Sequence, residues 1–138
     1  MLFQVSDSLD EKDAALLNVL QLAYVGDAVW EIAVRNHLIR RGYNLHHLHS
    51  ECIRRVNAHA QAEFAESLES ILTEEETDLM RRGRNAHSHH PVPKNQNPED
   101  YSKATAFEAL LGFHYLTGHE ERLSQIITLL IGGETENG

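Results

Sequence analysis

Apolar residues recur at helical spacing along nearly the whole chain, and no stretch alternates apolar and polar residues as a half-buried strand does. This periodicity predicts an all-α fold. The predicted helices cover residues 10–42, 45–68, 73–83, 101–116 and 119–131. A break is expected near the histidine run at 46–49, and Thr73 and Glu76 form a capping-box pattern that begins the third helix. Gly26 lies inside the first helix, where it costs about 1 kcal/mol relative to Ala, so we expect either a close approach of another backbone or a slight break there.

The length and composition are those of a soluble protein. The chain has 138 residues, so we expect one domain over 1–138, with 132–138 as a flexible tail. Its longest apolar run, residues 126–131, is far shorter than the about 20 residues that a transmembrane helix needs, and no signal-peptide pattern opens the chain. The single cysteine, Cys52, cannot form an intramolecular disulfide, which fits a reducing compartment. We therefore expect a cytoplasmic protein without a membrane association.

Charge is distributed unevenly along the chain. The net charge of −9 excludes a protein that coats nucleic acid through overall positive charge. Residues 63–80 hold acids but neither Lys nor Arg, which is typical of a solvated face. Residues 81–98 hold no acid, and they overlap a segment without helical periodicity, 84–100, that contains all three prolines. Its cations are either solvated or suited to contact a phosphate backbone.

Two histidine clusters, at 46–49 and 87–90, raise the question of a zinc site. Neither cluster has the regular spacing of zinc ligands, and no cysteine accompanies them. We expect these histidines to lie on the surface or near phosphate.

Two carboxylates interrupt the apolar faces of predicted helices. Asp27 shares a stripe with Ala23 and Val34, and Glu108 shares one with Leu111. A carboxylate removed from water without a partner costs several kcal/mol, so each needs a cation or hydrogen-bond donors. One interpretation is two separate structural acids satisfied by an Arg, a Tyr or a helix N-terminus. The other is a shared Mg²⁺, which one or two carboxylates and waters commonly hold, and which next to a basic loop indicates phosphodiester chemistry.

The sequence around these acids resembles a known family. Residues 22–29 (LAYVGDAV) resemble the ribonuclease III signature helix, and residues 105–112 (TAFEALLG) resemble the second metal-binding motif of that family. Together with residues 82–86 (RGRNA), they are most similar to the Mini-ribonuclease III branch, a catalytic domain without the double-stranded-RNA-binding domain. Ala23 and Thr105 stand where full-length ribonuclease III has two further acids, a departure that the branch shares. We expect looser Mg²⁺ binding as a result.

The resemblance implies a ribonuclease III endonuclease-domain fold and a homodimer, with the signature helix at a two-fold interface and Trp30 or Tyr24 near the partner. It implies that Asp27 and Glu108 bind Mg²⁺, for which Mn²⁺ can substitute, and catalyse the cleavage of double-stranded RNA to a 5′-phosphate and a 3′-hydroxyl. For this branch the implied substrate is precursor 23S ribosomal RNA, with a large-subunit ribosomal protein as a further partner. The residues expected to contact RNA are Arg54, Arg55, Arg82, Arg84, Asn85 and Lys94.

Two other functions remain open at this stage. The acids absent at Ala23 and Thr105 would suit a non-catalytic helical module for RNA binding or ribosome assembly, although Asp27 and Glu108 are both present. An all-α nucleotide pyrophosphohydrolase would need closely spaced acid pairs on one face, and the only such acids, in residues 63–78, are expected to be solvated.

Overall fold

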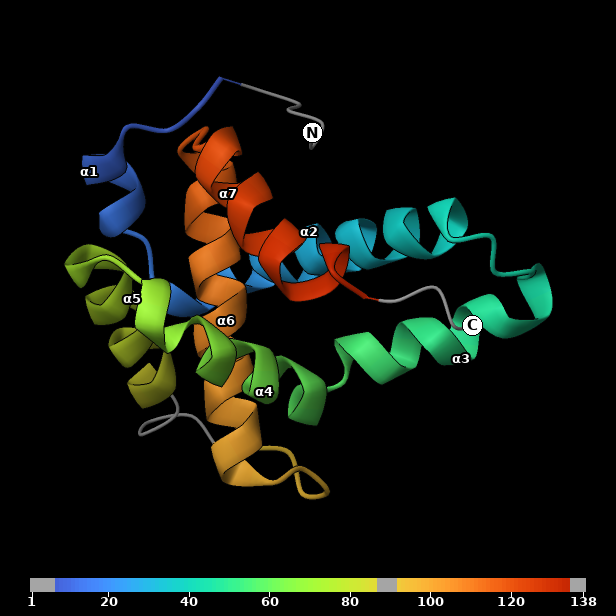
Figure 1. Cartoon of the computed structure of the whole chain (residues 1–138). Helices are drawn as coiled ribbons and strands as arrows, with labels where there is room; N and C mark the ends of the chain where they lie inside the picture. Colours follow the sequence, from blue (N-terminus) through green and yellow to red (C-terminus); the bar gives the residue numbers. More distant parts are fainter. Residues whose placement is uncertain (1–6, 87–91, 135–138) are drawn as a thin grey trace.

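The computed structural model describes residues 7–86 and 92–134, and within these residues all regular secondary structure is helical (Figure 1). The prediction of an all-α fold is therefore confirmed. The elements are α1 (Glu11–Ala15), α2 (Val19–Arg40), α3 (Leu45–Val56), α4 (Ala58–Leu68), the 3-10 turn η1 (Glu69–Ile71), α5 (Glu74–Asn85), α6 (Pro98–Leu116), α7 (Glu120–Ile127) and the π-helical turn η3 (Thr128–Gly132).

Asparagine caps decide where several helices begin. Asn18 forms a capping box with Gln21 at the start of α2, so the first predicted helix is divided into α1 and α2. Asn44 caps α3, which runs without interruption through the histidines at 46–49. The break expected there was wrong: it falls at Asn57, whose extended backbone ends α3 and whose side chain caps α4. A single asparagine is a weak breaker in a sequence, because it is also tolerated inside helices.

The capping box at the start of α5 is confirmed. The backbone N–H of Glu76 donates to Thr73 Oγ1 at 3.1 Å, and the N–H of Thr73 donates to Glu76 Oε1 at 2.9 Å. The helix continues beyond Gly83, where the sequence predicted its end. Helix α6 begins earlier than predicted, because Asn97 caps it and Pro98 occupies its first turn, where a missing N–H is tolerated.

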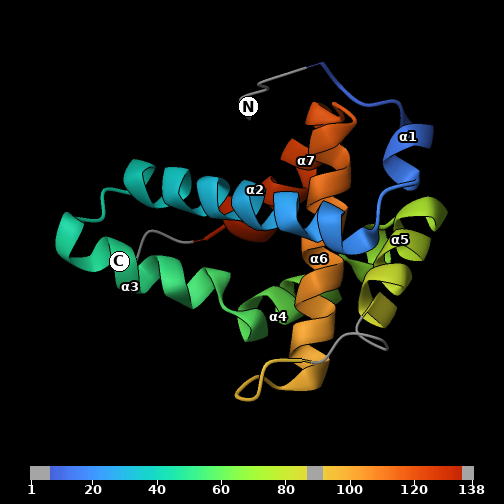
Figure 2. The same ribbon diagram turned by 180° about the vertical axis from the view of Figure 1, so that it is seen from behind.

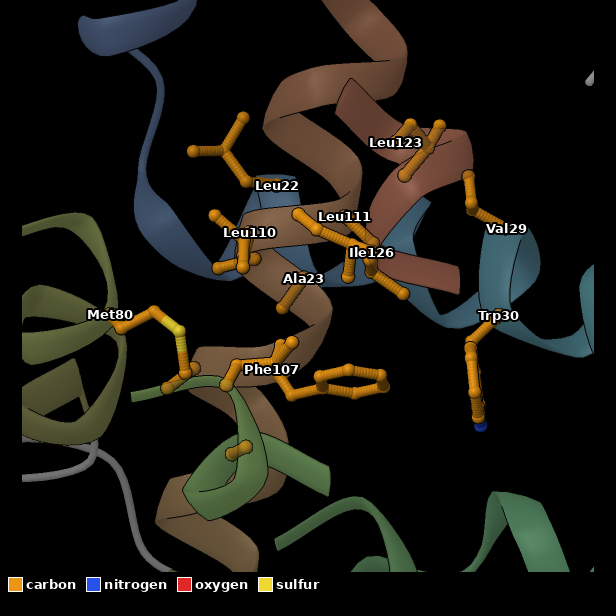
Figure 3. Close-up of a cluster of buried hydrophobic side chains, with 14 of the residues drawn as sticks. Leu22, Ala23, Val29, Trp30, Met80, Phe107, Leu110, Leu111, Leu123 and Ile126 are labelled. Atoms are coloured by element: carbon orange, nitrogen blue, oxygen red, sulfur yellow. The ribbon is translucent and has the colours of Figure 1, made fainter. Parts of the chain in front are cut away.

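Helix α6 is the centre of the molecule. Helix α2 crosses it, and α4 and α5 pack against it as well, as the two opposite views show (Figures 1 and 2). Trp30 of α2 and Phe107 of α6 are completely buried, with ring centroids 5.0 Å apart in an edge-to-face arrangement (Figure 3). Phe64 of α4 packs on the same indole, with the ring centroids 5.1 Å apart. Burial of each such side chain contributes roughly 1.5–3 kcal/mol, so this cluster fixes α2, α4 and α6 relative to one another.

Glycines allow the helices to approach α6 at backbone distance. A Cβ built on Gly26 would lie 1.6 Å from the carbonyl oxygen of Glu108, and one built on Gly112 would lie 1.9 Å from the carbonyl oxygen of Leu22. The close approach predicted from Gly26 is therefore confirmed. Gly83 serves the same purpose between α5 and α6, because a Cβ there would lie 2.6 Å from the Cα of Ala106. This contact is why α5 continues through Gly83 instead of ending at it.

No helix in the part of the chain that the structure describes is long and apolar enough to cross a membrane. Of the expected tail, residues 132–134 are described, and the Glu134 carboxylate is bonded to Arg55 and His37. Residues 135–138 and the histidines at 87–90 lie outside the described residues.

Candidate active site

The crossing of α2 and α6 brings Asp27 and Glu108 together. Asp27 follows Gly26, and the absence of a side chain at Gly26 lets the α2 backbone lie directly on the backbone of Glu108. The Asp27 carboxylate lies close enough to Glu108 to raise the pKa of that carboxyl. Asp27 is exposed and Glu108 is half-buried, so the pair is accessible from the Asp27 side. Two acids that lie far apart in the sequence thus form one site.

The Glu108 carboxyl is strongly perturbed. Burial raises its pKa to about 9, and the hydrogen bond to Asp27 and the negative charge of Asp27 act in the same direction. Within residues 7–86 and 92–134, no Lys, Arg or His forms an ion pair with either acid. Two carboxyls in contact must share a proton or a cation. The interpretation of two separate structural acids, each satisfied by its own partner, does not fit this arrangement.

Gln61 on α4 also lies at this site, and it is not among the residues that the sequence predicted there. Its Nε2 donates to the carbonyl oxygen of Val56 at 3.3 Å, and its side chain acts to lower the pKa of Glu108, against the larger effects of burial and of Asp27. Only 2% of Gln61 is exposed. The available signal was its place on the apolar stripe of α4, which continues through Ala65 and Leu68.

The donor set fits a hard divalent cation. Carboxylate and amide oxygens are the ligands that Mg²⁺ takes in proteins, and a cation would relieve the repulsion between Asp27 and Glu108. Among the described residues no group of three or more His, Cys, Asp or Glu side chains converges on a metal position. Ala23 and Thr105, which stand where the resemblance would place two further acids, supply no ligand. Ala23 is buried against the core, and the Thr105 hydroxyl donates to the carbonyl oxygen of Tyr101 at 3.0 Å.

The basic side chains fall into two groups. Arg82, Arg84 and Asn85 end α5, and Lys94 lies in the segment that leads into α6; Arg84, Asn85 and Lys94 are exposed, and Arg82 is partly buried. The C-terminal end of α5 and the segment that leads into α6 lie toward the N-terminal end of α6 (Figure 1). The second group is on α3.

In the second group, Arg54 and Arg55 differ sharply. The Arg54 side chain is 73% exposed, and its Nη1 donates to Glu51 Oε2 at 3.1 Å. The Arg55 side chain is only 14% exposed. Arg55 Nη2 donates to Glu134 at 2.8 Å, and its Nη1 donates to Glu51 at 2.9 Å. The guanidinium of Arg55 therefore links Glu134, which follows η3, to Glu51 of α3.

Trp30 and Tyr24 lie on different faces of α2. Trp30 is completely buried, and its Nε1 donates to the carbonyl oxygen of Arg55 at 2.8 Å, so of the two aromatic residues Trp30 belongs to the core. Tyr24 is 84% exposed, and Ala28 and Ile32 follow it on the same outward face. The helix thus keeps an apolar surface that residues 7–86 and 92–134 do not cover.

A second buried carboxylate lies away from this site. Glu76, which the acidic run led us to expect in solvent, is only 5% exposed. It accepts hydrogen bonds from His114 Nε2 at 2.6 Å and from Arg122 Nη2 at 2.6 Å. These donors, with the backbone N–H of Thr73, hold the pKa of Glu76 down at about 2 despite its burial. Burial in turn lowers the pKa of His114.

Comparisons with known proteins agree with this architecture. A model of the ribonuclease III domain matches residues 20–119, a span that includes all the candidate site residues. Mini-ribonuclease 3 of Symbiobacterium thermophilum is 48% identical over 109 residues, covering 78% of this chain and 83% of that protein. Mini-ribonuclease 3 of Brevibacillus brevis is 45% identical over 117 residues, covering 84% and 87%. A crystal structure of a Fusobacterium nucleatum protein superposes with a TM-score of 0.79 at 32% identity, covering 89% of this chain and 98% of that one.

Proposed function

The chain belongs to the ribonuclease III family and is an endoribonuclease, and from this premise we propose that it cleaves double-stranded RNA with the help of Mg²⁺ at Asp27 and Glu108. The observation that carries the proposal is the direct contact of these two acids across the glycine-mediated crossing of α2 and α6. Nothing on their own chain neutralises the pair within the described residues, and a divalent cation would.

In the proposed reaction the chain prepares the site before substrate arrives. The helix crossing holds Glu108, and exposed Asp27 would meet the phosphodiester. The ion supplies Lewis-acid chemistry, which stabilises charge on the phosphate and makes a water easier to deprotonate. Mn²⁺ should substitute for Mg²⁺, because both take oxygen ligands. Water attacks in line, leaving a 5′-phosphate and a 3′-hydroxyl.

The proposed RNA contacts are Arg54, Arg82, Arg84, Asn85 and Lys94. The exposure of all of these except the partly buried Arg82 supports this role, since cationic and amide side chains that reach solvent can follow the phosphates and 2′-hydroxyls of a duplex. We leave Arg55 outside this set, because its guanidinium is bonded to Glu134 and Glu51. With a net charge of −9 the protein should bind RNA modestly and with a strong dependence on salt.

The uncovered face of α2 supports a homodimer. Tyr24 and Ile32, which are 84% and 54% exposed, lie on this face with Ala28, beside the active-site Asp27. A two-fold pairing through α2 would give two equivalent sites, one for each strand of an RNA duplex. We propose precursor 23S ribosomal RNA, in the cytoplasm, as the substrate. A large-subunit ribosomal protein that shapes the RNA would add the affinity that the acidic chain lacks.

The test is cleavage of a long duplex RNA with Mg²⁺ by the wild type, Asp27→Asn and Glu108→Gln. We expect discrete products from the wild type and at least a hundredfold loss in both variants, with folding and oligomeric state unchanged. A catalytic proposal fails if Glu108→Gln cuts as well as the wild type. If the wild type binds the duplex and never cuts it, the absent acids at Ala23 and Thr105 decide the function, and a non-catalytic RNA-binding module replaces the nuclease.

A further inference from the structure

Two histidines at the junction of α6 and α7 connect an acid of α5 with an acid of α1. His114 Nε2 lies 2.6 Å from Glu76 Oε2, and His114 Nδ1 lies 3.0 Å from His119 Nδ1. His119 Nε2 in turn lies 2.8 Å from Glu11 Oε1. The two rings thus form an unbroken chain of close polar contacts from buried Glu76 to exposed Glu11.

This chain of contacts restricts where its protons lie. The Glu76 carboxylate is ionised, because its pKa is held at about 2, so His114 Nε2 carries the proton of their hydrogen bond. Only one proton fits between the two Nδ1 atoms, because a hydrogen bond needs one donor and one acceptor. The ring that carries this proton is the charged histidine.

Thr117 assigns that proton to His119. The Thr117 hydroxyl lies 2.7 Å from the carbonyl oxygen of Phe113, and two oxygens at this distance need the hydroxyl proton between them. The hydroxyl oxygen can therefore only accept from His119 Nδ1, which lies 3.1 Å away. His119 Nε2 also carries a proton, because it lies against the Glu11 carboxylate. His119 is thus a doubly protonated imidazolium, and His114 is neutral.

The charges around the two rings fit this assignment. Burial lowers the pKa of His114, and the positive charges of His119 and Arg122 lower it further. The hollows beside His119 carry more acids than cations among the described residues: the acids are Glu11, Glu74, Glu75, Glu76, Asp78, Glu120 and Glu121, and the cations are Lys12, Arg82 and Arg122. The acids favour the charge on His119, whereas the cations and the N-terminus of α7 oppose it, so the ring carries a proton that it can lose.

His119 lies where the segment around α1 docks on the end of α6. The backbone N–H of Leu9 donates to the carbonyl oxygen of Leu116 at 2.7 Å, and a Cβ built on Gly118 would lie 2.3 Å from Ser8 Oγ. Ala14 of α1 is completely buried. A helix as short as α1 is not stable by itself, so it persists only through such contacts.

We propose that His119 is a pH-sensitive clasp for α1: with both nitrogens protonated it holds Glu11 on one side and Thr117 and His114 on the other, and loss of one proton breaks one side. Docking of α1 is therefore firmest while His119 is charged, and it weakens as the pH rises and the ring becomes neutral. The inference does not depend on the proposed function, because it uses neither Asp27 nor Glu108.

The test follows the ring nitrogens of His119 and the amide exchange of Leu9 by NMR, from about pH 6 to pH 9. At the lower pH we expect both nitrogens of His119 to be protonated and His114 to carry its proton on Nε2 alone. The exchange rate of the Leu9 amide, corrected for the intrinsic effect of pH, should rise roughly fivefold as His119 loses its proton, as for the loss of a partly exposed ion pair.

Glu11→Gln tests the clasp from the side of α1. It removes the carboxylate and keeps the length of the side chain, so we expect fast Leu9 exchange already at pH 6, with little further change as the pH rises. Asp13→Asn is the matched control, because it removes another exposed acid from the first turn of α1. It should keep the slow exchange of the wild type at pH 6 and its rise with pH.

Two results would overturn the clasp. One is a neutral His119 at pH 6, which would contradict the proton assignment. The other is wild-type Leu9 exchange at pH 6 in Glu11→Gln, which would show that the contact with His119 does not hold α1. Cleavage of RNA enters neither result, so a failure of the clasp leaves the proposed nuclease standing.

Discussion

Two glutamates of this protein have pKa values that are shifted in opposite directions. The pKa of Glu76 is held at about 2, because Arg122, His114 and the backbone N–H of Thr73 donate to its carboxylate. The pKa of Glu108 is raised to about 9, because it is buried and its neighbour is another acid, Asp27. Among the described residues, an arginine and a histidine bond to Glu76, whereas no Lys, Arg or His pairs with Glu108, for which we propose a divalent cation. A buried acid that its own chain neutralises is structural, and one that it does not neutralise indicates a functional site.

The largest expected effect is on the structural glutamate. Glu76→Ala leaves Arg122 and His114 without their shared acceptor, so we expect the free energy of unfolding to fall by about 3–5 kcal/mol. Urea unfolding followed by circular dichroism measures this. If Glu76→Ala were as stable as the wild type, the comparison would fail, because the cluster would contribute nothing to the fold.

The pH dependence of stability sharpens the comparison. The Glu76 pKa is lowered from 4.5 to about 2, so its stabilising contribution is present above pH 4.5 and is lost as the pH falls toward 2, a change of about 3 kcal/mol. The pKa of His114 is lowered from 6.5, so the unfolded state binds its proton first and stability begins to fall below pH 6.5. Urea unfolding at a series of pH values measures both effects. The decrease between pH 4.5 and pH 2 should be smaller in Glu76→Gln, where Glu51 and Glu134, whose pKa values are also lowered, still contribute.

A single substitution at Gly26 can disrupt the close contact between α2 and α6. In Gly26→Ala the added Cβ would lie 1.6 Å from the carbonyl oxygen of Glu108, so α2 and α6 must move apart. We expect a loss of about 1–3 kcal/mol in the free energy of unfolding, together with loss of RNA cleavage, because Asp27 no longer meets Glu108. Gly133→Ala is the control, since a Cβ there meets nothing within 4 Å. Cleavage at the wild-type rate by a folded Gly26→Ala would show that the contact is dispensable.

The smallest expected change is a gain. Glu108→Gln removes a buried carboxyl that sits against Asp27, so in the absence of divalent cations we expect it to raise the free energy of unfolding by about 1 kcal/mol while cleavage is lost. Urea unfolding in the presence of a chelator measures the gain. A decrease would mean that Glu108 supports the fold, as Glu76 does.

Local patterns in the sequence predicted much of this architecture. The capping box of Thr73 and Glu76 and the close approach at Gly26 follow from residue types placed against helical periodicity. For Asp27 and Glu108 the periodicity left two interpretations open, and the resemblance to ribonuclease III implied that they form one site. Each of these predictions rests on a local sequence rule or on a residue that does not match its apolar surroundings. The ends of α5 and α6 differed from the prediction by a few residues, because Gly83 packs against another helix and Asn97 caps earlier.

What the sequence did not predict depends on contacts between distant segments. Glu76 belongs to an acidic run, and only the approach of His114 and Arg122 shows that it is buried. Gln61 resembles any polar helical residue until Glu108 is placed beside it. Trp30 could have served an interface as well as a core, and Phe64 and Phe107 decide for the core.

The most direct test of the difference between the two glutamates is the effect of Mg²⁺ on Tm in the wild type, Glu108→Gln and Glu76→Gln. We expect Mg²⁺ to raise the Tm of the wild type, because the ion binds the folded state at Asp27 and Glu108. We expect no such rise in Glu108→Gln, and the full rise, from a lower starting Tm, in Glu76→Gln. A full Mg²⁺-dependent rise in Glu108→Gln would contradict the assignment of Asp27 and Glu108 as the metal site.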